Sequence, residues 1–298
     1  MSVLLLVLPD FLLIGLGWVL YHRLGFSAKF FQDTERLVYF VLFPALLFHA
    51  TARAPLSPSG AMVLFEATAA LLACGVGLAW LAVPILRPDP IDHASTAQCA
   101  YRFNTYIGLS MAAALAAGPG QATMAVVAGF AVPFVNMAAV HALARQQHGR
   151  MLGEIVRNPF IIATVAGLTF NFLAIPIPAL LYTVLGRLGE SAIVMGLLCV
   201  GAVLSLSGGA RDAGLVTWMI AVRLILSPIA ALVIGWAMHL PLLERQMLLL
   251  FSALPASSSA HVLANRMGGN GRLTAMVMSL GTLLSAATIP FWLAVGPR

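Results

Sequence analysis

The chain has 298 residues, of which 61% are hydrophobic and 9% are charged, and its mean hydropathy is +0.97. Soluble domains carry about 25% charged residues, so this composition excludes both a water-soluble globule and a disordered chain. The net charge of +6 comes from basic residues in short loops between apolar runs. Such residues face the cytoplasm and anionic lipid headgroups, so we expect membrane lipid and no nucleic acid as a partner.

Taken in chain order, the apolar runs predict an all-α membrane protein with ten transmembrane helices. About 20 apolar residues, each rising 1.5 Å, cross a hydrocarbon core about 30 Å thick. Continuous runs of that length favour helices, which satisfy their own backbone hydrogen bonds in lipid. The ten spans are expected at residues 3–21, 37–52, 61–86, 95–117, 122–143, 159–176, 188–206, 214–239, 245–264 and 273–295.

The distribution of basic residues predicts the orientation of these spans. If the N-terminus is outside, ten lysine and arginine residues fall in inner loops and four in outer segments. Because cytoplasmic loops are enriched in basic residues, we expect a multi-pass protein of the cell (inner) membrane with both termini outside. The first apolar run has no basic region before it, so it is interpreted as a retained span and not a cleaved signal.

The chain divides into two halves of five spans. The longest polar connection, residues 144–158, is predicted to be a cytoplasmic linker between a first repeat at 1–143 and a second at 159–298. Because five is odd, the two halves have inverted topology, as in many secondary transporters. The fourth and ninth spans are both interrupted midway by polar residues or proline. A matched pair of interrupted spans is the best sequence indication of a transport site.

These segments resemble the auxin efflux carrier family, and in particular its bacterial malonate-type organic-anion carriers. The similar stretches, in chain order, are FVLFPALLFHA, RFNTYIGLSMA, RNPFIIATVAGLTFNFLAIPIP, LCVGAVLSL, VRLILSPIAA and SALPASSSAHVLANRMGG. The resemblance implies ten helices with crossovers at helices four and nine, a scaffold domain, and elevator-type alternating access. It also implies a secondary-active carrier for a small organic anion such as a carboxylate. The substrate, the direction of transport and the oligomeric state stay open, with a homodimer as one option.

The fourth span offers the first group of candidate substrate-binding residues. Asn104 and Thr105 lie at its break, where the following half-helix presents its N-terminus near the midplane. Free N–H groups and the positive dipole end favour an anion there, so Asn104 either caps this half-helix or contacts substrate. Arg102 either draws an anion into the inner vestibule or extends to the cytoplasm. Asn136, in the fifth span, matches a polar position of the family and is a further lining candidate.

The ninth span offers a second group around Pro255. Proline removes an N–H and kinks a helix, and the neighbouring serines either satisfy the freed carbonyls or bind an anion. The serine candidates are Ser257, Ser258 and Ser259. His261 lies four residues after Ser257 and shares its helix face, so it is a candidate proton relay or a packing residue.

Two carboxylates lie within spans and are candidates for ion coupling. Asp10 and Glu66 both enter from the outer side, and each either exchanges a proton or is hydrogen-bonded beneath the surface. Plant members of the family carry an acidic residue in the third span, which favours Glu66. Arg223, in the eighth span, is expected to extend toward the cytoplasm and contact the membrane surface.

Alternative functions are less well matched by the residues. A sodium-coupled symporter of the bile-acid type has similar crossovers but needs several carboxylates or carboxamides beside them, and this chain offers few. No protease motif and no nucleotide-binding loop occurs, so an enzyme or an ATP-driven pump is not expected. A receptor would not need two matched breaks. We therefore expect no cofactor and no metal, since CxxC motifs are also absent.

Overall fold

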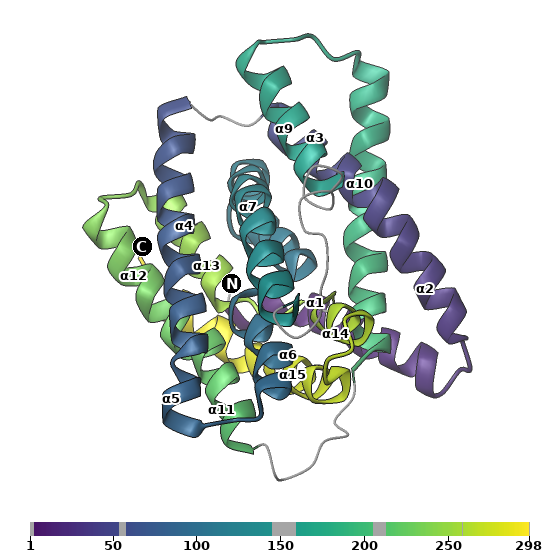
Figure 1. Ribbon diagram of the computed structural model, residues 1–298. Helices are drawn as coiled ribbons and strands as arrows, with labels where there is room; N and C mark the ends of the chain where they lie inside the picture. Colours follow the sequence, from purple (N-terminus) through teal and green to yellow (C-terminus); the bar gives the residue numbers. More distant parts are fainter. Residues whose placement is uncertain (1–2, 54–57, 145–158, 205–212, 258, 298) are drawn as a thin grey trace.

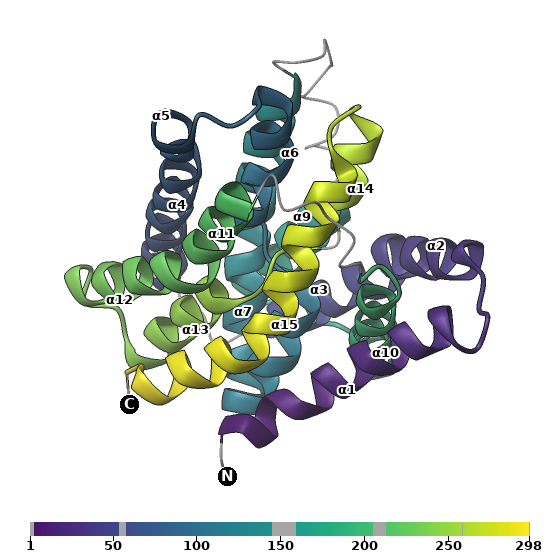
Figure 2. The ribbon, with the colours of Figure 1, turned by 90° about the horizontal axis from the view of Figure 1, so that it is seen from below.

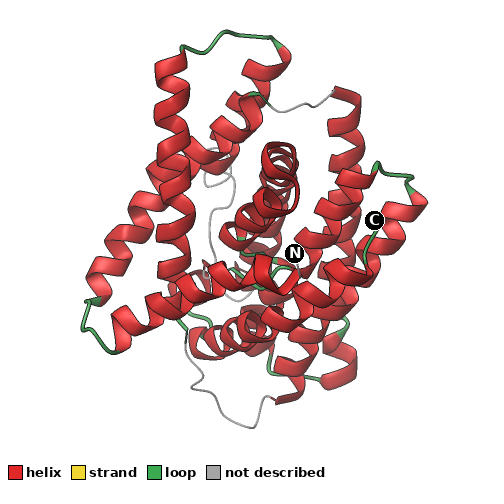
Figure 3. Ribbon diagram, turned by 180° about the vertical axis from the view of Figure 1, so that it is seen from behind, coloured by secondary structure: helices red, strands yellow, loops and turns green. Residues whose placement is uncertain are grey.

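The computed structural model describes residues 3–53, 58–144, 159–204, 213–257 and 259–297, and within this part all regular structure is helical (Figures 1 and 3). The elements are α1 (Val3–His22), α2 (Ala28–Leu37), η1 (Val38–Leu42), α3 (Phe43–Ala52), α4 (Pro58–Trp80), α5 (Ala82–Leu86), α6 (Pro90–Tyr101), α7 (Thr105–Ala144), α9 (Pro159–Phe172), α10 (Ala179–Ala202), α11 (Ala213–Ala221), η3 (Val222–Leu226), α12 (Ser227–Ala237), α13 (Leu242–Ala253), α14 (Ser259–Arg266) and α15 (Gly271–Val295).

Six helical stretches among the described residues are long and apolar enough to cross a membrane. They are Ala28–Ala52, Gly60–Leu86, Pro90–Leu143, Ala179–Ala202, Ala213–Ala237 and Gly271–Val295, and shorter apolar helices cover Leu8–His22 and Ile162–Phe172. The prediction of an all-helical, multi-pass membrane protein is confirmed to this extent. Apart from Ala144, which ends α7, the predicted linker lies outside the described residues.

The helices pack into two groups, which lie on opposite sides of the molecule in Figure 2. In the first group, α1 packs on α10, and α3 packs on both α9 and α10. In the second, here called the crossover group, α4, α6, α7 and α11–α15 pack on one another. Glycines let α1 and α10 approach closely, since a Cβ at Gly201 would lie 1.9 Å from the carbonyl oxygen of Ile14.

Two π-helical turns mark the positions of prolines inside spanning segments. η1 ends two residues before Pro44, and η3 ends two residues before Pro228. Proline has no N–H and its ring clashes with the carbonyl four residues earlier, so the helix widens there. At η3 the carbonyl oxygen of Leu224 accepts instead from Nε1 of Trp292 at 2.8 Å.

Two helices are interrupted where the sequence predicts breaks. α6 ends at Tyr101, residues 102–104 are not helical, and α7 begins at Thr105. In the same way α13 ends at Ala253, its C-cap Leu254 is extended with ψ 143°, and α14 begins at Ser259. A second irregularity in α7, at Ala117 with φ 45°, separates the predicted fourth and fifth spans.

Candidate functional site

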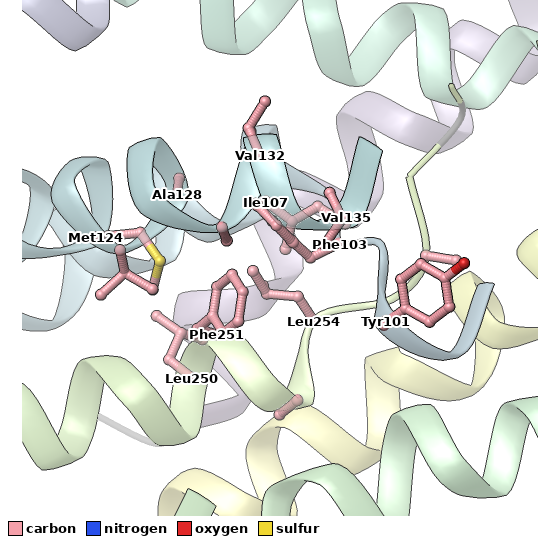
Figure 4. Packing of buried hydrophobic residues seen from close by; sticks show 14 of the residues in the cluster. Tyr101, Phe103, Ile107, Met124, Ala128, Val132, Val135, Leu250, Phe251 and Leu254 are labelled. Atoms are coloured by element: carbon pink, nitrogen blue, oxygen red, sulfur yellow. The ribbon is translucent and has the colours of Figure 1, made fainter. Parts of the chain in front are cut away.

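The two helix breaks touch each other in the core of the crossover group (Figure 4). The backbone N–H of Asn104 donates to the carbonyl oxygen of Pro255 at 2.8 Å. The Phe103 and Phe251 rings pack with centroids 4.4 Å apart. Gly108 leaves room for Leu254, because a Cβ at this glycine would lie 2.7 Å from Cδ1 of that leucine. Segments about 150 residues apart in sequence therefore form one buried crossing, here called the crossover.

Asn104 caps the half-helix that follows the first break. Its Oδ1 accepts from the backbone N–H groups of Tyr106 at 3.1 Å and Ile107 at 3.2 Å, which are free donors at the start of α7. The side chain is only 2% exposed, and its Nδ2 is buried without a hydrogen-bond partner among the described residues. The capping alternative is thus confirmed, and a buried donor remains at the N-terminus of α7. Thr105, the first residue of α7, is half-buried beside it.

Arg102 is buried and held by two neutral side chains, so the expectation that it extends to the cytoplasm is wrong. Its guanidinium donates to Oε1 of Gln98 at 3.1 Å and to Oδ1 of Asn136 at 2.8 Å. Among the described residues no carboxylate forms an ion pair with it. The structure therefore brings together Arg102 and Asn136, which the sequence predicts separately. Gln98 was missed, although its place one helical turn before Arg102 was a usable signal.

Arg223 does not extend to the membrane surface as predicted, because its side chain points into the crossover group. It is 4% exposed, and its guanidinium donates to the carbonyl oxygens of Leu254 at 2.5 Å and Phe251 at 2.7 Å. These carbonyls end α13, where the helix dipole is negative and four carbonyls lack helical partners. Arg223 therefore stabilises the second break.

The serines after Pro255 form a short local network. The Oγ atoms of Ser257 and Ser259 lie 2.9 Å apart, and Ser257 Oγ accepts from the backbone N–H of Ser259 at 3.4 Å. Both serines are half-buried at the start of α14. Ser258 lies outside the described residues. Ser257 thus accepts from one backbone N–H at the start of α14, whereas the two roles predicted for the serines, binding freed carbonyls or an anion, stay predictions.

Comparison with known families identifies the protein class. The model of the membrane transport protein family, that of the auxin efflux carriers, matches residues 143–293, which is more than half of the chain. The chain belongs to this family. No curated protein matches it. Members of the family are transporters and not enzymes, so this is a multi-pass membrane transport protein. The matched residues include the second break and Arg223, whereas the first break precedes them.

The candidate coupling residues of the transporter occupy different environments. Asp10 is 4% exposed on α1, and its Oδ1 accepts from Ser110 Oγ of α7 at 2.6 Å. Its Oδ2 is buried without a partner among the described residues. Glu66 lies on an exposed face of α4, and His261 is half-buried on α14. Of these residues, Asp10 bridges the two helix groups.

Two hollows of the transporter lie away from the crossover. One cavity of about 210 Å³ is at the ends of α12 and α15, and a hollow of about 430 Å³ runs along α2 and η1. The residues at the centre of the crossing are buried, with Phe103 3% and Leu254 0% exposed, whereas Thr105, Ser257 and Ser259 are half-buried at its edge. Among the described residues, no three histidine, cysteine or acidic side chains are grouped to hold a metal ion.

Proposed function

We propose that this transporter is a secondary-active carrier for a small organic anion such as a carboxylate, which binds at the crossover. The observation that carries the proposal is the buried guanidinium of Arg102, whose partners Gln98 and Asn136 are both neutral. A buried cation without a counter-ion is costly in a membrane interior. An incoming carboxylate supplies the missing negative charge and accepts charge-assisted hydrogen bonds.

The first break adds further donors for the same anion. The N-terminus of α7 carries a partial positive charge, which favours a carboxylate. The buried, unpartnered Nδ2 of Asn104 is the neighbouring donor. From the second break, Pro255, Ser257 and Ser259 approach the same region, with Thr105 and Asn136 as further lining residues. Ser258, which lies outside the described residues, is a further candidate. The buried centre of the crossover agrees with a site that opens toward one side at a time.

We propose the ten-helix, inverted-repeat arrangement for the whole chain, with repeats at 1–143 and 159–298. Matching irregularities support it. Each broken helix follows a hairpin that contains a non-glycine residue in the left-handed region, Arg87 with φ 49° before α6 and His239 with φ 51° before α13. Such residues are uncommon, so their recurrence at corresponding places supports an internal repeat.

An elevator motion agrees with the division into two helix groups. In this proposal the group of α1, α3, α9 and α10 is the scaffold, and the crossover group moves against it. The contacts between them include the Phe43 and Tyr106 rings, with centroids 5.0 Å apart, and the hydrogen bond between Ser110 and Asp10.

For the coupling group we propose Asp10, with Glu66 and His261 as the other candidates. A carboxylate between scaffold and moving group, with one oxygen lacking a partner, changes its interactions when the groups shift. Asp10→Asn should abolish proton-driven accumulation and leave substrate exchange intact. Glu66→Gln, on the exposed face of α4, is measured beside it and should accumulate substrate normally if Asp10 is the coupling group. Normal accumulation by Asp10→Asn would transfer the proposal to the other candidates or to sodium.

The decisive experiment is uptake into proteoliposomes across a panel of mono- and dicarboxylates, with and without pH and sodium gradients. We expect uptake of at least one carboxylate, driven by the pH gradient or by exchange. Transport of cations or neutral solutes only would refute the proposed substrate class. Accumulation that requires sodium would favour the bile-acid-type alternative, which the family match does not favour.

The proposed orientation is tested by cysteine labelling. The protein would carry Cys74→Ser, because Cys74 is exposed whereas Cys99 and Cys199 are buried. With both termini outside, a cysteine replacing Arg53 or Arg187 reacts in intact cells. One replacing Arg266 reacts only after permeabilisation. Reaction of the Arg266 position in intact cells would contradict the inverted topology.

A further inference from the structure

A cavity of about 210 Å³ lies where three helix ends meet, far from the crossover. α12 and α15 end beside it and α13 begins there, as Figure 2 shows near the C-terminus. Both Ala213–Ala237 and Gly271–Val295 are long and apolar enough to cross a membrane. Because two spanning helices end at the cavity, it lies at the level of one membrane surface.

The cavity combines one cationic side chain with an apolar wall. Arg245 is its charged lining residue, and Ala231, Leu232 and Val295 belong to its apolar wall. The Nε of Arg245 is buried without a hydrogen-bond partner among the described residues, and no carboxylate there forms an ion pair with it. Its aliphatic stem packs on Gly235, since a Cβ at that glycine would lie 3.2 Å from Arg245 Cγ. The aliphatic stem is therefore packed, and the charged end of the side chain lines the cavity.

We propose that this cavity binds the phosphate of an anionic phospholipid, with Arg245 as the donor. A guanidinium matches the geometry and charge of phosphate, and Arg245 is half-buried, so part of its side chain is accessible at the cavity. The apolar wall accommodates the first part of an acyl chain, which a soluble phosphate does not have. Trp236, on the same cavity, is 73% exposed, and exposed tryptophans are typical of the membrane interface. The proposal is independent of the substrate site at the crossover.

The test uses the purified full chain in detergent. Phosphatidylglycerol, phosphatidylcholine with the same chains, and glycerol 3-phosphate are titrated separately, and the unfolding temperature and the lipid retained in native mass spectrometry are recorded. We expect phosphatidylglycerol to raise the unfolding temperature more than phosphatidylcholine does. Loss of a charge-assisted hydrogen bond costs about 1.5–3 kcal/mol, so Arg245→Gln should bind this lipid roughly tenfold or more weakly.

Matched variants separate the site from general surface charge. Arg187→Gln removes an exposed arginine of α10 and should leave lipid binding unchanged. Arg245→Lys keeps a positive charge and should retain part of the binding. Leu232→Trp fills the apolar wall and should weaken phosphatidylglycerol binding while Arg245 remains. Equal stabilisation by both lipids, or unchanged binding by Arg245→Gln or Leu232→Trp, would overturn the proposal. Equal stabilisation by glycerol 3-phosphate would overturn the lipid as occupant.

Discussion

Each of the two breaks has a buried arginine beside it, and the two guanidinium groups meet different partners. Arg223 donates to two backbone carbonyls at the C-terminal end of α13. Arg102 donates to the side-chain amide oxygens of Gln98 and Asn136. Both are nearly inaccessible, with 4% and 8% exposure respectively. Burial alone therefore does not distinguish their roles, but the acceptors of their hydrogen bonds do.

The difference lies in the groups that accept their hydrogen bonds. The C-terminal end of a helix carries about half a negative elementary charge, and Arg223 binds carbonyl oxygens at that end of α13. Arg102 is itself the C-cap of α6, but its guanidinium donates to neutral side-chain amides and to no carbonyl oxygen of that helix end. Arg223 therefore stabilises the fold of the second break, whereas for Arg102 we propose a role in binding a mobile anion. Removal of Arg223 should therefore lower the stability of the protein, whereas removal of Arg102 should weaken carboxylate binding.

The largest expected effect is on stability, through Arg223. Arg223→Leu leaves the carbonyl oxygens of Phe251 and Leu254 buried without a donor, at a cost of about 1–3 kcal/mol each. We expect a clearly lower unfolding temperature of the purified protein in detergent. Arg223→Lys should recover part of the loss, because an ammonium group still donates hydrogen bonds. A Leu variant as stable as the wild type would remove the structural role assigned to this arginine.

The next effect concerns binding, through Arg102. Arg102→Gln loses the hydrogen bonds to Gln98 and Asn136 but also removes a buried charge that has no counter-ion, so stability should fall less than in Arg223→Leu. Binding of the carboxylate identified by the uptake panel should weaken about tenfold or more, since a charge-assisted hydrogen bond contributes about 1.5–3 kcal/mol. Equilibrium binding and thermal unfolding of the same preparation give both quantities. An unchanged dissociation constant, or a loss of stability like that of Arg223→Leu, would cancel the contrast between the two residues.

These roles were only partly predictable from the sequence. The breaks were predictable, because asparagine, proline and serine interrupt otherwise continuous apolar runs near Asn104 and Pro255. The direction of Arg223 was not, because a long side chain can reach along its own helix or across to another, and its partners lie about 30 residues away. The bridge from Asp10 to Ser110 spans 100 residues of sequence. Such contacts depend on how the two helix groups pack, which the local pattern does not encode.

The smallest effect separates the two functions of Asn104. Its Oδ1 caps α7, whereas its Nδ2 is the buried donor proposed for the anion. Asn104→Ser keeps a capping oxygen and removes the Nδ2, so it should weaken binding with little loss of stability. Asn104→Ala removes both and should cost about 1 kcal/mol of stability in addition.

Asn171→Ala is the control for the Asn104 pair, because Asn171 donates from Nδ2 to the Thr51 carbonyl oxygen at 3.1 Å, within the scaffold. This variant should lose about 1 kcal/mol of stability and bind the carboxylate normally. Comparing it with Asn104→Ala at similar stability isolates binding from folding. If Asn104→Ser binds the carboxylate as the wild type does, the Nδ2 has no ligand role. The polar residues of the first break would then act as a cap and a kink, and Arg102 alone would carry the anion proposal.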